Sequence, residues 1–281
     1  MRHLLLIFMT SLFILSSAHA ECEHAKELYE KASSGGVGLE EKISFLEQSV
    51  KECEGFPPYY ELGKAYAIKG ELKSAVYALK KAAAYAETAD KKAKTFTAMG
   101  RIYKADNKIE DAVRSYKTSL MFSRNKDVEK ELMEIEKEQI GSIVLSSSII
   151  STLQKNKNER SIGVVPSIDI RVNFEFDKYT LTELGKKQVE EIGKAMTSSD
   201  LSGMKFKLIG HTDSRGTDEY NDRLSLKRAE MVSDYLMKHF DLEDRIVSIE
   251  GKGKRELLYH DTTEDAHALN RRVAVEIIEN K

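Results

Sequence analysis

The chain has 281 residues, enough for two domains, and 41% of them are hydrophobic, which is ordinary for folded protein. Lys and Arg (44) nearly balance Asp and Glu (46), and residues 161–281 carry 19 basic against 23 acidic side chains, a net of -4. Because nucleic-acid binding depends on neutralising phosphates, this balance argues against a nucleic-acid partner.

The first twenty residues predict a cleavable secretory signal. Arg2 and His3 precede an apolar run from Leu4 to Leu15, and small residues end in Ala18-His19-Ala20. The apolar run is shorter than the roughly 20 residues that a helix needs to cross a bilayer, and no later segment is expected to span one. A lipid-attachment box needs a small residue where this chain has Glu21, so we expect no lipid anchor. The mature chain is predicted to begin at Glu21, after export.

Cys22 and Cys53 are the two cysteines of the chain. In an oxidising compartment we expect them to form a disulfide, which would close a loop of about 31 residues and stabilise the fold by about 3 to 4 kcal/mol. Two buried free thiols are the alternative. We predict no metal site, because only His24 stands close to Cys22 and the later histidines show no ligand spacing.

Residues 21–138 are predicted to be helical, with apolar residues recurring at three and four positions. Two stretches share the same offsets. The first has Tyr59, Leu62-Gly63, Tyr66, Ala75, Leu79 and Ala82, and the second has Phe96, Met99-Gly100, Tyr103, Ala112, Tyr116 and Ser119. This spacing resembles the tetratricopeptide repeat, in which each repeat is a hairpin of two helices. The two glycines would leave room for close helix contact.

The flanks of these repeats complete the predicted domain organisation. Residues 22–33 and 39–52 are expected to form another helix pair, and a charged helix from Asp127 to Ile140 is expected to cover the last apolar face of the repeats. Residues 141–165 become polar and predict a linker. We therefore expect a signal peptide at 1–20, helical repeats at 21–140, a linker at 141–165 and a second domain at 166–281.

From Ser167 the pattern changes to that of an α/β domain. Alternation from Ile168 to Phe174 predicts a strand, and the next helix is expected to begin after Thr180 as its N-cap. The remaining expected elements are a strand at 204–209, a helix at about 219–240 and strands at 245–250 and 271–278. The order βαβαββ predicts a mixed sheet with both helices on one face, a two-layer α/β sandwich. The whole chain is thus expected to be an α+β protein of two domains, the first an all-α solenoid.

The run Gly210-His211-Thr212-Asp213-Ser214-Arg215-Gly216 carries the clearest functional signal. It is followed by Asn221, Leu224-Ser225, Arg228-Ala229 and, later, Asn270-Arg271-Arg272-Val273. Together with Phe174 to Asp177, these segments resemble the OmpA-like peptidoglycan-binding domain, the family of OmpA, Pal and MotB, over roughly residues 167 to 279. The chain departs from the family pattern at Leu257-Leu258 and at Ala266-His267-Ala268, which leaves the segment 252–269 without a firm expectation.

The resemblance implies that Asp213 and Arg228 hold the meso-diaminopimelate of the peptidoglycan stem peptide, without covalent chemistry. The residue types agree, because diaminopimelate ends in a carbon that bears both an ammonium and a carboxylate. The planar fork of Arg228 suits the carboxylate, and Asp213 would accept from the ammonium. Backbone N–H groups near Asn221, at the start of the helix, could add to the stabilisation of the carboxylate. The competing interpretation is that Asp213 and Arg228 pair with each other, or that Asp213 caps the turn.

Four further residues are candidates for the same site. Asn221 would either touch the ligand or fix the entrance of the helix. Arg272 would either contact the wall or make a structural ion pair, because Arg271 and Arg272 alternate across a strand. Asp177 and Thr212 would line the pocket.

An enzyme is not expected. The residue types of a hydrolytic triad are present in His211, Asp213, Ser214 and Ser225. However, His211 and Asp213 are near neighbours at one strand end, and no Gly-x-Ser-x-Gly pattern is present. We predict no catalysis and no cofactor, and we interpret His211 as structural.

The leading hypothesis is a periplasmic cell-wall anchor. The second domain would bind peptidoglycan, and the helical repeats would bind an unidentified protein partner. Any outer-membrane association would come through that partner, without a membrane span. The alternatives are a periplasmic scaffold that joins two proteins without wall binding, and a wall hydrolase.

Overall fold

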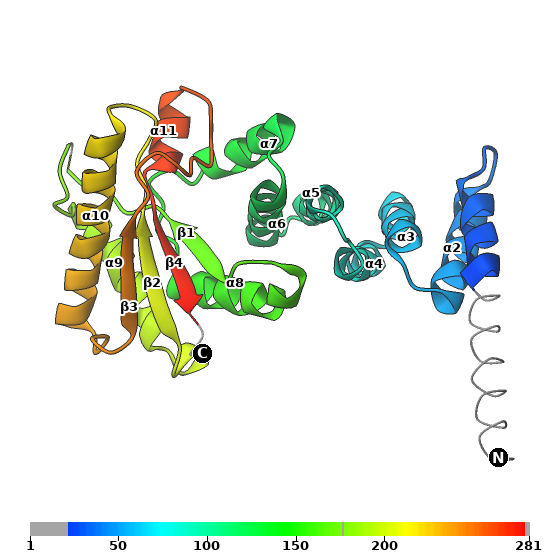
Figure 1. Cartoon of the computed structure of the whole chain (residues 1–281), viewed down its shortest axis with the longest axis horizontal. Helices are drawn as coiled ribbons and strands as arrows, with labels where there is room; N and C mark the ends of the chain where they lie inside the picture. The colour runs from blue at the N-terminus through cyan, green and yellow to red at the C-terminus, as the bar shows by residue number, and fades with distance from the viewer. Residues whose placement is uncertain (1–21, 176, 279–281) are drawn as a thin grey trace, which may run out of the picture. The chain divides into compact units, whose positions relative to one another are not determined.

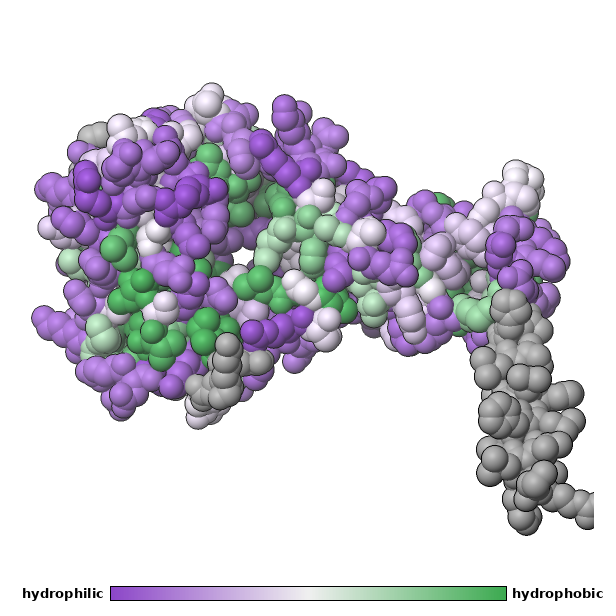
Figure 2. Space-filling model, in the orientation of Figure 1, coloured by the Kyte–Doolittle hydropathy of each residue, from purple (hydrophilic) through white to green (hydrophobic). Residues whose placement is uncertain are grey.

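The computed structural model describes residues 22–175 and 177–278, and it divides the chain into two compact units, Met1–Arg124 and Asn125–Lys281 (Figure 1). The predicted signal peptide lies outside the described residues. No helix in the described part is long and apolar enough to cross a membrane. The surface in Figure 2 is mostly hydrophilic, with apolar residues interspersed among charged ones.

In its described part, residues 22–124, the first unit contains helices and no strand. A helix covers residues 22–33, and α2 (Leu39–Glu52), α3 (Phe56–Lys69), α4 (Leu72–Ala84), α5 (Ala89–Ala105) and α6 (Ile109–Phe122) follow. Helix α3 packs on α4, and α5 packs on α6. The expected disulfide is confirmed, because Cys22 and Cys53 are bonded and join the first helix to the end of α2.

Two glycines allow these hairpins to close. A Cβ added to Gly63 would lie 2.7 Å from Cγ of Leu79, and one added to Gly100 would lie 2.7 Å from the ring of Tyr116. Contacts this short do not occur between real side chains, so the second helix can approach only a glycine. The predicted hairpins are confirmed, and the tetratricopeptide class of the repeats stays a prediction.

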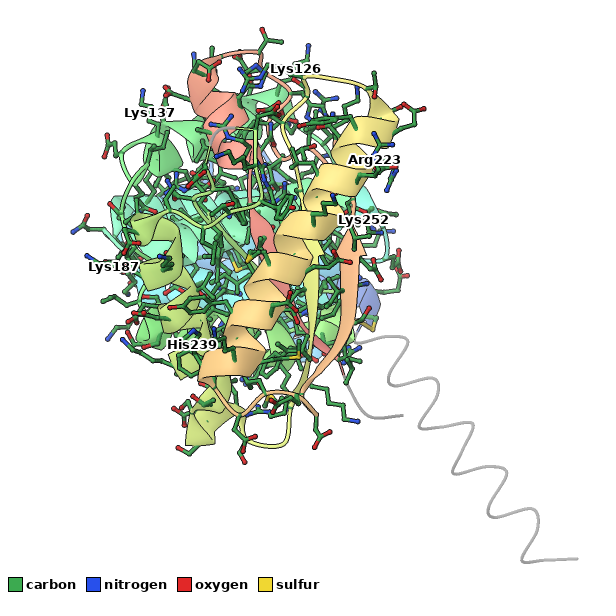
Figure 3. The ribbon with its side chains drawn as sticks, turned by 90° about the vertical axis from the view of Figure 1, so that its left-hand side faces the viewer. Lys126, Lys137, Lys187, Arg223, His239 and Lys252 are labelled. Atoms are coloured by element: carbon green, nitrogen blue, oxygen red, sulfur yellow. A yellow bond between two sulfur atoms is a disulfide. The ribbon has the colours of Figure 1, made fainter. Side chains whose placement is uncertain are left out.

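The second unit contains the predicted mixed sheet. Its strands are β1 (Ser167–Ile170), β2 (Lys205–Gly210), β3 (Ile246–Gly251) and β4 (Val273–Ile278), in the order β1-β4-β2-β3. Strand β2 is parallel to β3, and β4 is antiparallel to both β1 and β2. Helices α9 (Glu183–Thr197) and α10 (Asp218–His239) pack against the sheet and against each other. The predicted two-layer α/β architecture is confirmed (Figures 1 and 3).

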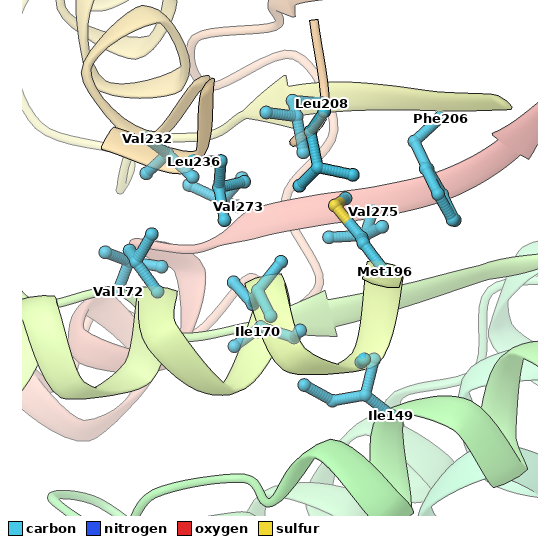
Figure 4. Packing of buried hydrophobic residues seen from close by; sticks show 14 of the residues in the cluster. Ile149, Ile170, Val172, Met196, Phe206, Leu208, Val232, Leu236, Val273 and Val275 are labelled. Atoms are coloured by element: carbon cyan, nitrogen blue, oxygen red, sulfur yellow. The ribbon is translucent and has the colours of Figure 1, made fainter. Parts of the chain in front are cut away.

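The core of this unit lies between the helices and the sheet. Alternate residues of β2 and β4 point toward the helix layer, where they meet apolar side chains of α9 and α10 (Figure 4). The labelled members from these four elements are Phe206, Leu208, Val273, Val275, Met196, Val232 and Leu236, and each has 0% of its surface exposed. This core packs α10 against β2, and the candidate site lies at the end of β2 and the beginning of α10.

The prediction that residues 141–165 form a linker between the domains is wrong. This segment contains helix α8 (Ser146–Asn158), whose Ile149 and Leu153 are fully buried in the same core, beside Ile170 of β1. The side-chain amide of Gln188 also donates to the carbonyl of Val144 and accepts from its N–H, at 3.0 and 2.8 Å. The two apolar residues stand four apart, so they share one helix face, while the polar residues around them hide this pattern.

Helix α7 (Lys126–Lys137) belongs to the second unit, so the predicted domain end at residue 140 is also wrong. It packs on α11 (Glu264–Asn270), a short helix in the segment without a firm expectation. Glu136 accepts a hydrogen bond from the hydroxyl of Tyr259, and Glu129 pairs with His260 at 3.3 Å. These polar contacts come from residues far along the chain, and helical periodicity gives no sign of them.

Three expected element ends differ as well. Strand β4 begins at Val273, so Arg271 and Arg272 precede the strand instead of opening it. Strand β1 ends at Ile170, and Phe174 instead forms an isolated bridge with Leu181. Because this bridge keeps Leu181 extended, α9 begins after Thr182, whose hydroxyl accepts from the N–H of Gly185 at 3.1 Å. Thr182, not Thr180, is therefore the N-cap.

Candidate functional site

The loop from β2 to α10 is held close to the helix that follows it. A Cβ on Gly210 would lie 2.0 Å from the backbone oxygen of Ser225, so only glycine fits where the strand ends. Gly216 has a φ of 83°, in the left-handed region. Thr217 then caps α10, its hydroxyl accepting from the N–H of Tyr220 at 3.2 Å. The loop therefore has a defined path between two anchored ends.

Asn221 fixes that path. Its side-chain amide donates to the carbonyls of Arg215 and Thr217 at 2.7 and 3.0 Å, and the residue is only 3% exposed. These contacts support the interpretation that Asn221 fixes the helix entrance. They also hold Arg215 in the turn beside Asp213.

Asp213 is a buried carboxylate with several donors around it. Its Oδ1 accepts from the backbone N–H and the Nε–H of Arg215 at 3.1 and 3.2 Å. Its Oδ2 accepts from Nη2 of Arg215 at 2.7 Å and from Nη1 of Arg271 at 2.8 Å. Burial opposes ionisation, but the hydrogen bonds from Arg215 and Arg271 outweigh it and lower the pKa of Asp213 to about 2. The side chain is therefore an anion at neutral pH.

Arg228 is the corresponding buried cation. The residue is 7% exposed, its Nε–H donates to the carbonyl of Lys178 at 3.1 Å, and its guanidinium lies 5.0 Å from the centre of the Phe174 ring. Burial lowers the pKa of Arg228, and the nearby guanidinium of Arg271 lowers it further. Among the described residues, no carboxylate pairs with Arg228, and its two terminal nitrogens make no hydrogen bond.

Asp213 and Arg228 do not pair with each other, so the first half of the competing interpretation is wrong; the second half agrees with the structure, because Asp213 caps the turn by accepting from the backbone N–H of Arg215. Asp213 instead pairs with Arg215 and Arg271, two residues that were not assigned to the site from the sequence. The signal for Arg215 was present, because an Asp side chain at the start of a turn commonly accepts from the backbone N–H two residues later. Arg271 is the C-cap of α11 and stands two residues before β4, and it reaches Asp213 because β4 pairs with β2, which only the sheet order reveals.

The other sequence candidates occupy different places. Asp177 has a φ of 57° and accepts from the hydroxyl of Tyr220, next to the Lys178 carbonyl that holds Arg228. Thr212 is 2% exposed, and its hydroxyl has no hydrogen-bond partner among the described residues. Arg272 makes the structural ion pair left open above, with its Nε 2.7 Å from Oδ1 of Asp169. We therefore leave Arg272 out of the site.

The residue types of a hydrolytic triad are present but not connected. His211 is 3% exposed, and its Nδ1 has no hydrogen-bond partner in the described part of the chain. Burial and then the charge of Arg272 lower the pKa of His211 to about 3, so the ring is neutral. The Ser225 hydroxyl donates to the carbonyl of Asp222 and accepts from the N–H of Gly253. Within the described residues no group of three or more His, Cys, Asp or Glu side chains could hold a metal ion.

The geometry therefore combines two recognition groups at the end of β2 and on α10. One is an ionised carboxylate held by arginines, and the other is a buried guanidinium whose terminal nitrogens have no hydrogen-bond partner among the described residues. An anion can bind the guanidinium through two charge-assisted hydrogen bonds, and a cation can bind the carboxylate. The arrangement suits a ligand that carries both charges.

Comparison with known proteins identifies sequences similar to the second unit. Residues 173–271 match the model of the OmpA family. The chain is 37% identical over 105 residues to outer membrane protein A of Bordetella avium, covering 37% of this chain and 53% of that protein. It is 31% identical over 117 residues to outer membrane porin F of Pseudomonas aeruginosa, covering 42% of this chain and 33% of that protein. The chain thus spans about half or less of the length of these two relatives.

Among solved structures, the peptidoglycan-associated lipoprotein from Burkholderia pseudomallei is 27% identical, with a TM-score of 0.34. The match covers 38% of this chain and 88% of that one. Residues 173–271 of this protein form an OmpA-like domain.

Proposed function

We propose that the OmpA-like domain binds peptidoglycan without covalent chemistry, through the diaminopimelate of the stem peptide, and anchors a partner of the helical unit to the cell wall. The observation that carries this proposal is the state of Arg228. It is a buried cation with no carboxylate partner among the described residues. The two relatives of this chain named above are outer-membrane proteins by name, and the solved neighbour is a peptidoglycan-associated lipoprotein by name.

The energetics favour an anionic ligand at this position. A buried charge without a partner costs several kcal/mol of solvation, and a ligand carboxylate would offset that cost when it binds. The Nε–H of Arg228 is already occupied by the Lys178 carbonyl, which aligns the guanidinium and leaves its terminal nitrogens for the ligand. Diaminopimelate supplies the carboxylate, and its ammonium lies on the same carbon, within reach of an acidic group such as Asp213.

The helical unit offers a surface for the partner. A hollow of about 470 Å³ lies between α2, α3 and α4, and its lining includes Tyr59, Leu62, Tyr66 and Tyr77. Tyr77 is 64% exposed, although it is a large aromatic side chain. Tyrosines with an apolar ring and a polar end are common in protein interfaces. In this proposal the fusion joins a protein-binding unit to a wall-binding unit in the periplasm.

Sedimentation with purified sacculi tests the proposal. The mature protein should pellet with the sacculi, whereas Asp213→Ala and Arg228→Ala should stay in the supernatant. Removing one partner of a buried charge pair costs on the order of 2 to 5 kcal/mol, which is roughly 30-fold or more in affinity. Arg223→Ala is the matched control, because Arg223 is exposed and lies five residues earlier on the same helix (Figure 3).

Each other outcome has a definite meaning. If the wild-type protein stays in the supernatant, wall binding is wrong and the scaffold alternative takes its place. If all variants pellet equally, the wall is bound but Asp213 and Arg228 are not its site. Release of soluble muropeptides would instead show a hydrolase.

A further inference from the structure

Donors from the described residues occupy the acceptor positions of the Asp213 carboxylate. An ionised carboxylate offers about four lone-pair positions on its two oxygens. Four N–H groups take them, namely the backbone N–H, Nε and Nη2 of Arg215 and Nη1 of Arg271. A ligand ammonium can therefore reach Asp213 only if one of these donors leaves.

The side chain of Arg215 is the donor best placed to leave. The backbone N–H of Arg215 is part of a turn that Asn221 holds. The Arg271 side chain is 34% exposed, and the Arg215 side chain is 52% exposed. Arg215 also already donates to a second carboxylate, through Nη1 to Oε1 of Glu264 at 2.7 Å. Leaving Asp213 would therefore not leave its guanidinium without a partner.

We propose that Arg215 is a built-in competitor for the ligand's ammonium. It occupies Asp213 in the free protein and is held by Glu264 alone when an ammonium-bearing ligand binds. The exchange replaces one cation by another, so the charge around Asp213 is conserved. A ligand without a free ammonium cannot make this exchange, and Arg215 thereby sets the specificity of the site. This inference rests on the proposed function.

The opposite role for Arg215 makes the opposite prediction. If Arg215 bound a carboxylate of the ligand, removing its charge would weaken binding. If Arg215 competes with the ligand, removing its charge strengthens binding. Asp213 stays charged in either case, because Arg271 still donates to it. The sign of the change therefore separates the two roles.

Isothermal titration calorimetry of the mature protein with the tripeptide L-Ala-γ-D-Glu-meso-diaminopimelate measures that sign. We expect Arg215→Gln to bind roughly three- to tenfold more tightly than wild type, the size expected for losing a partly exposed charge-assisted pair. Glu264→Gln should bind about two- to threefold more weakly, because Arg215 loses its alternative partner. In the Arg215→Gln background, Glu264→Gln should change nothing.

A tripeptide acetylated on the diaminopimelate amine provides the second control. Arg215→Gln should gain no affinity for it, because it brings no ammonium to Asp213. Equal or weaker binding of the free tripeptide by Arg215→Gln would overturn the competitor role while leaving wall binding intact. A persistent effect of Glu264→Gln in the double variant would also overturn it. If wild type and every variant fail to bind the tripeptide, the proposed function itself is wrong, and the competitor role falls with it.

Discussion

Arg228 and Arg272 are equally buried arginines, and we predict that replacing them has different effects on stability. They are 7% and 6% exposed. Arg272 pairs with Asp169, whereas no described carboxylate pairs with Arg228. We therefore expect Arg228→Met to leave the free energy of unfolding within about 1 kcal/mol of wild type, and Arg272→Met to lower it by about 2 to 4 kcal/mol.

The small change in unfolding free energy expected for Arg228→Met is the sum of opposing contributions, each estimated from a contact of Arg228. Replacing a buried ion pair by apolar residues of similar size is often neutral or stabilises by about 1 to 4 kcal/mol, and we expect the loss of the buried charge of Arg228 to fall in the same range. Against this, the hydrogen bond to the Lys178 carbonyl contributes about 1.5 to 3 kcal/mol, because its donor is charged. The cation–π contact with Phe174 contributes about 0.5 to 2 kcal/mol, and a methionine sulfur beside the ring recovers about half of that. The terms nearly cancel.

The measurement is urea unfolding of the full mature chain. Hydrogen exchange and mass spectrometry on peptides from β2 and β4 follow the unfolding, so the stability of the second unit is measured separately from that of the first. The expected result is a wild-type midpoint for Arg228→Met and a clearly lower one for Arg272→Met. Equal losses for the two variants would refute the reasoning, because Arg228 would then be a structural residue whose charge is already compensated inside the protein.

Three further predictions concern the fold and the charge of Asp213. The pKa of Asp213 is about 2 in the folded protein, below the ordinary value of 3.8, so its ionised form stabilises the fold above pH 4 and that contribution is lost as the pH falls toward 2. The difference in unfolding free energy between wild type and Asp213→Asn, measured from pH 2 to 7, should be about 2 kcal/mol at neutral pH and should vanish at the acid end; a constant difference would contradict this. Leu153→Ala should lower the unfolding free energy of the second unit by about 2 to 5 kcal/mol in urea, whereas a tether at 141–165 would show no change. Gly100→Ala should destabilise the helical unit by about 1 to 3 kcal/mol, because the new Cβ meets the Tyr116 ring at 2.7 Å, and an unchanged thermal midpoint by circular dichroism would argue against that packing.

Local patterns predicted the parts of the fold that depend on local sequence. The helix hairpins follow from the spacing of Gly63 and Gly100 with the residues that close on them, and the sheet follows from alternation along β2 and β4. Helix α8 was missed because its buried face consists mainly of Ile149 and Leu153 among Ser, Asn and Lys. Burial by a distant partner, not local composition, makes that segment part of the core.

The candidate site likewise combines residues that the local sequence predicted with contacts that only the fold determines. The motif singled out Asp213 and Arg228, and their buried, charged state agrees with a binding role. The partners of Asp213 depend on tertiary structure, since Arg271 precedes β4, the strand that pairs with β2, and Arg272 pairs instead with Asp169. Both arginines lie between α11 and β4 and not in a strand, so strand alternation could not decide which of them reaches the site.

The central claim is that Arg228 binds the carboxylate of a diaminopimelate zwitterion. The most direct measurement compares the affinity of the mature protein for the diaminopimelate tripeptide with its affinity for the same peptide carrying lysine, which has the ammonium but lacks that carboxylate. The account predicts at least about tenfold tighter binding of the diaminopimelate peptide by wild type, and no preference in Arg228→Met, because one charge-assisted bidentate contact contributes about 1.5 to 3 kcal/mol. Equal affinity of wild type for the two peptides, or an undiminished preference in Arg228→Met, would contradict it.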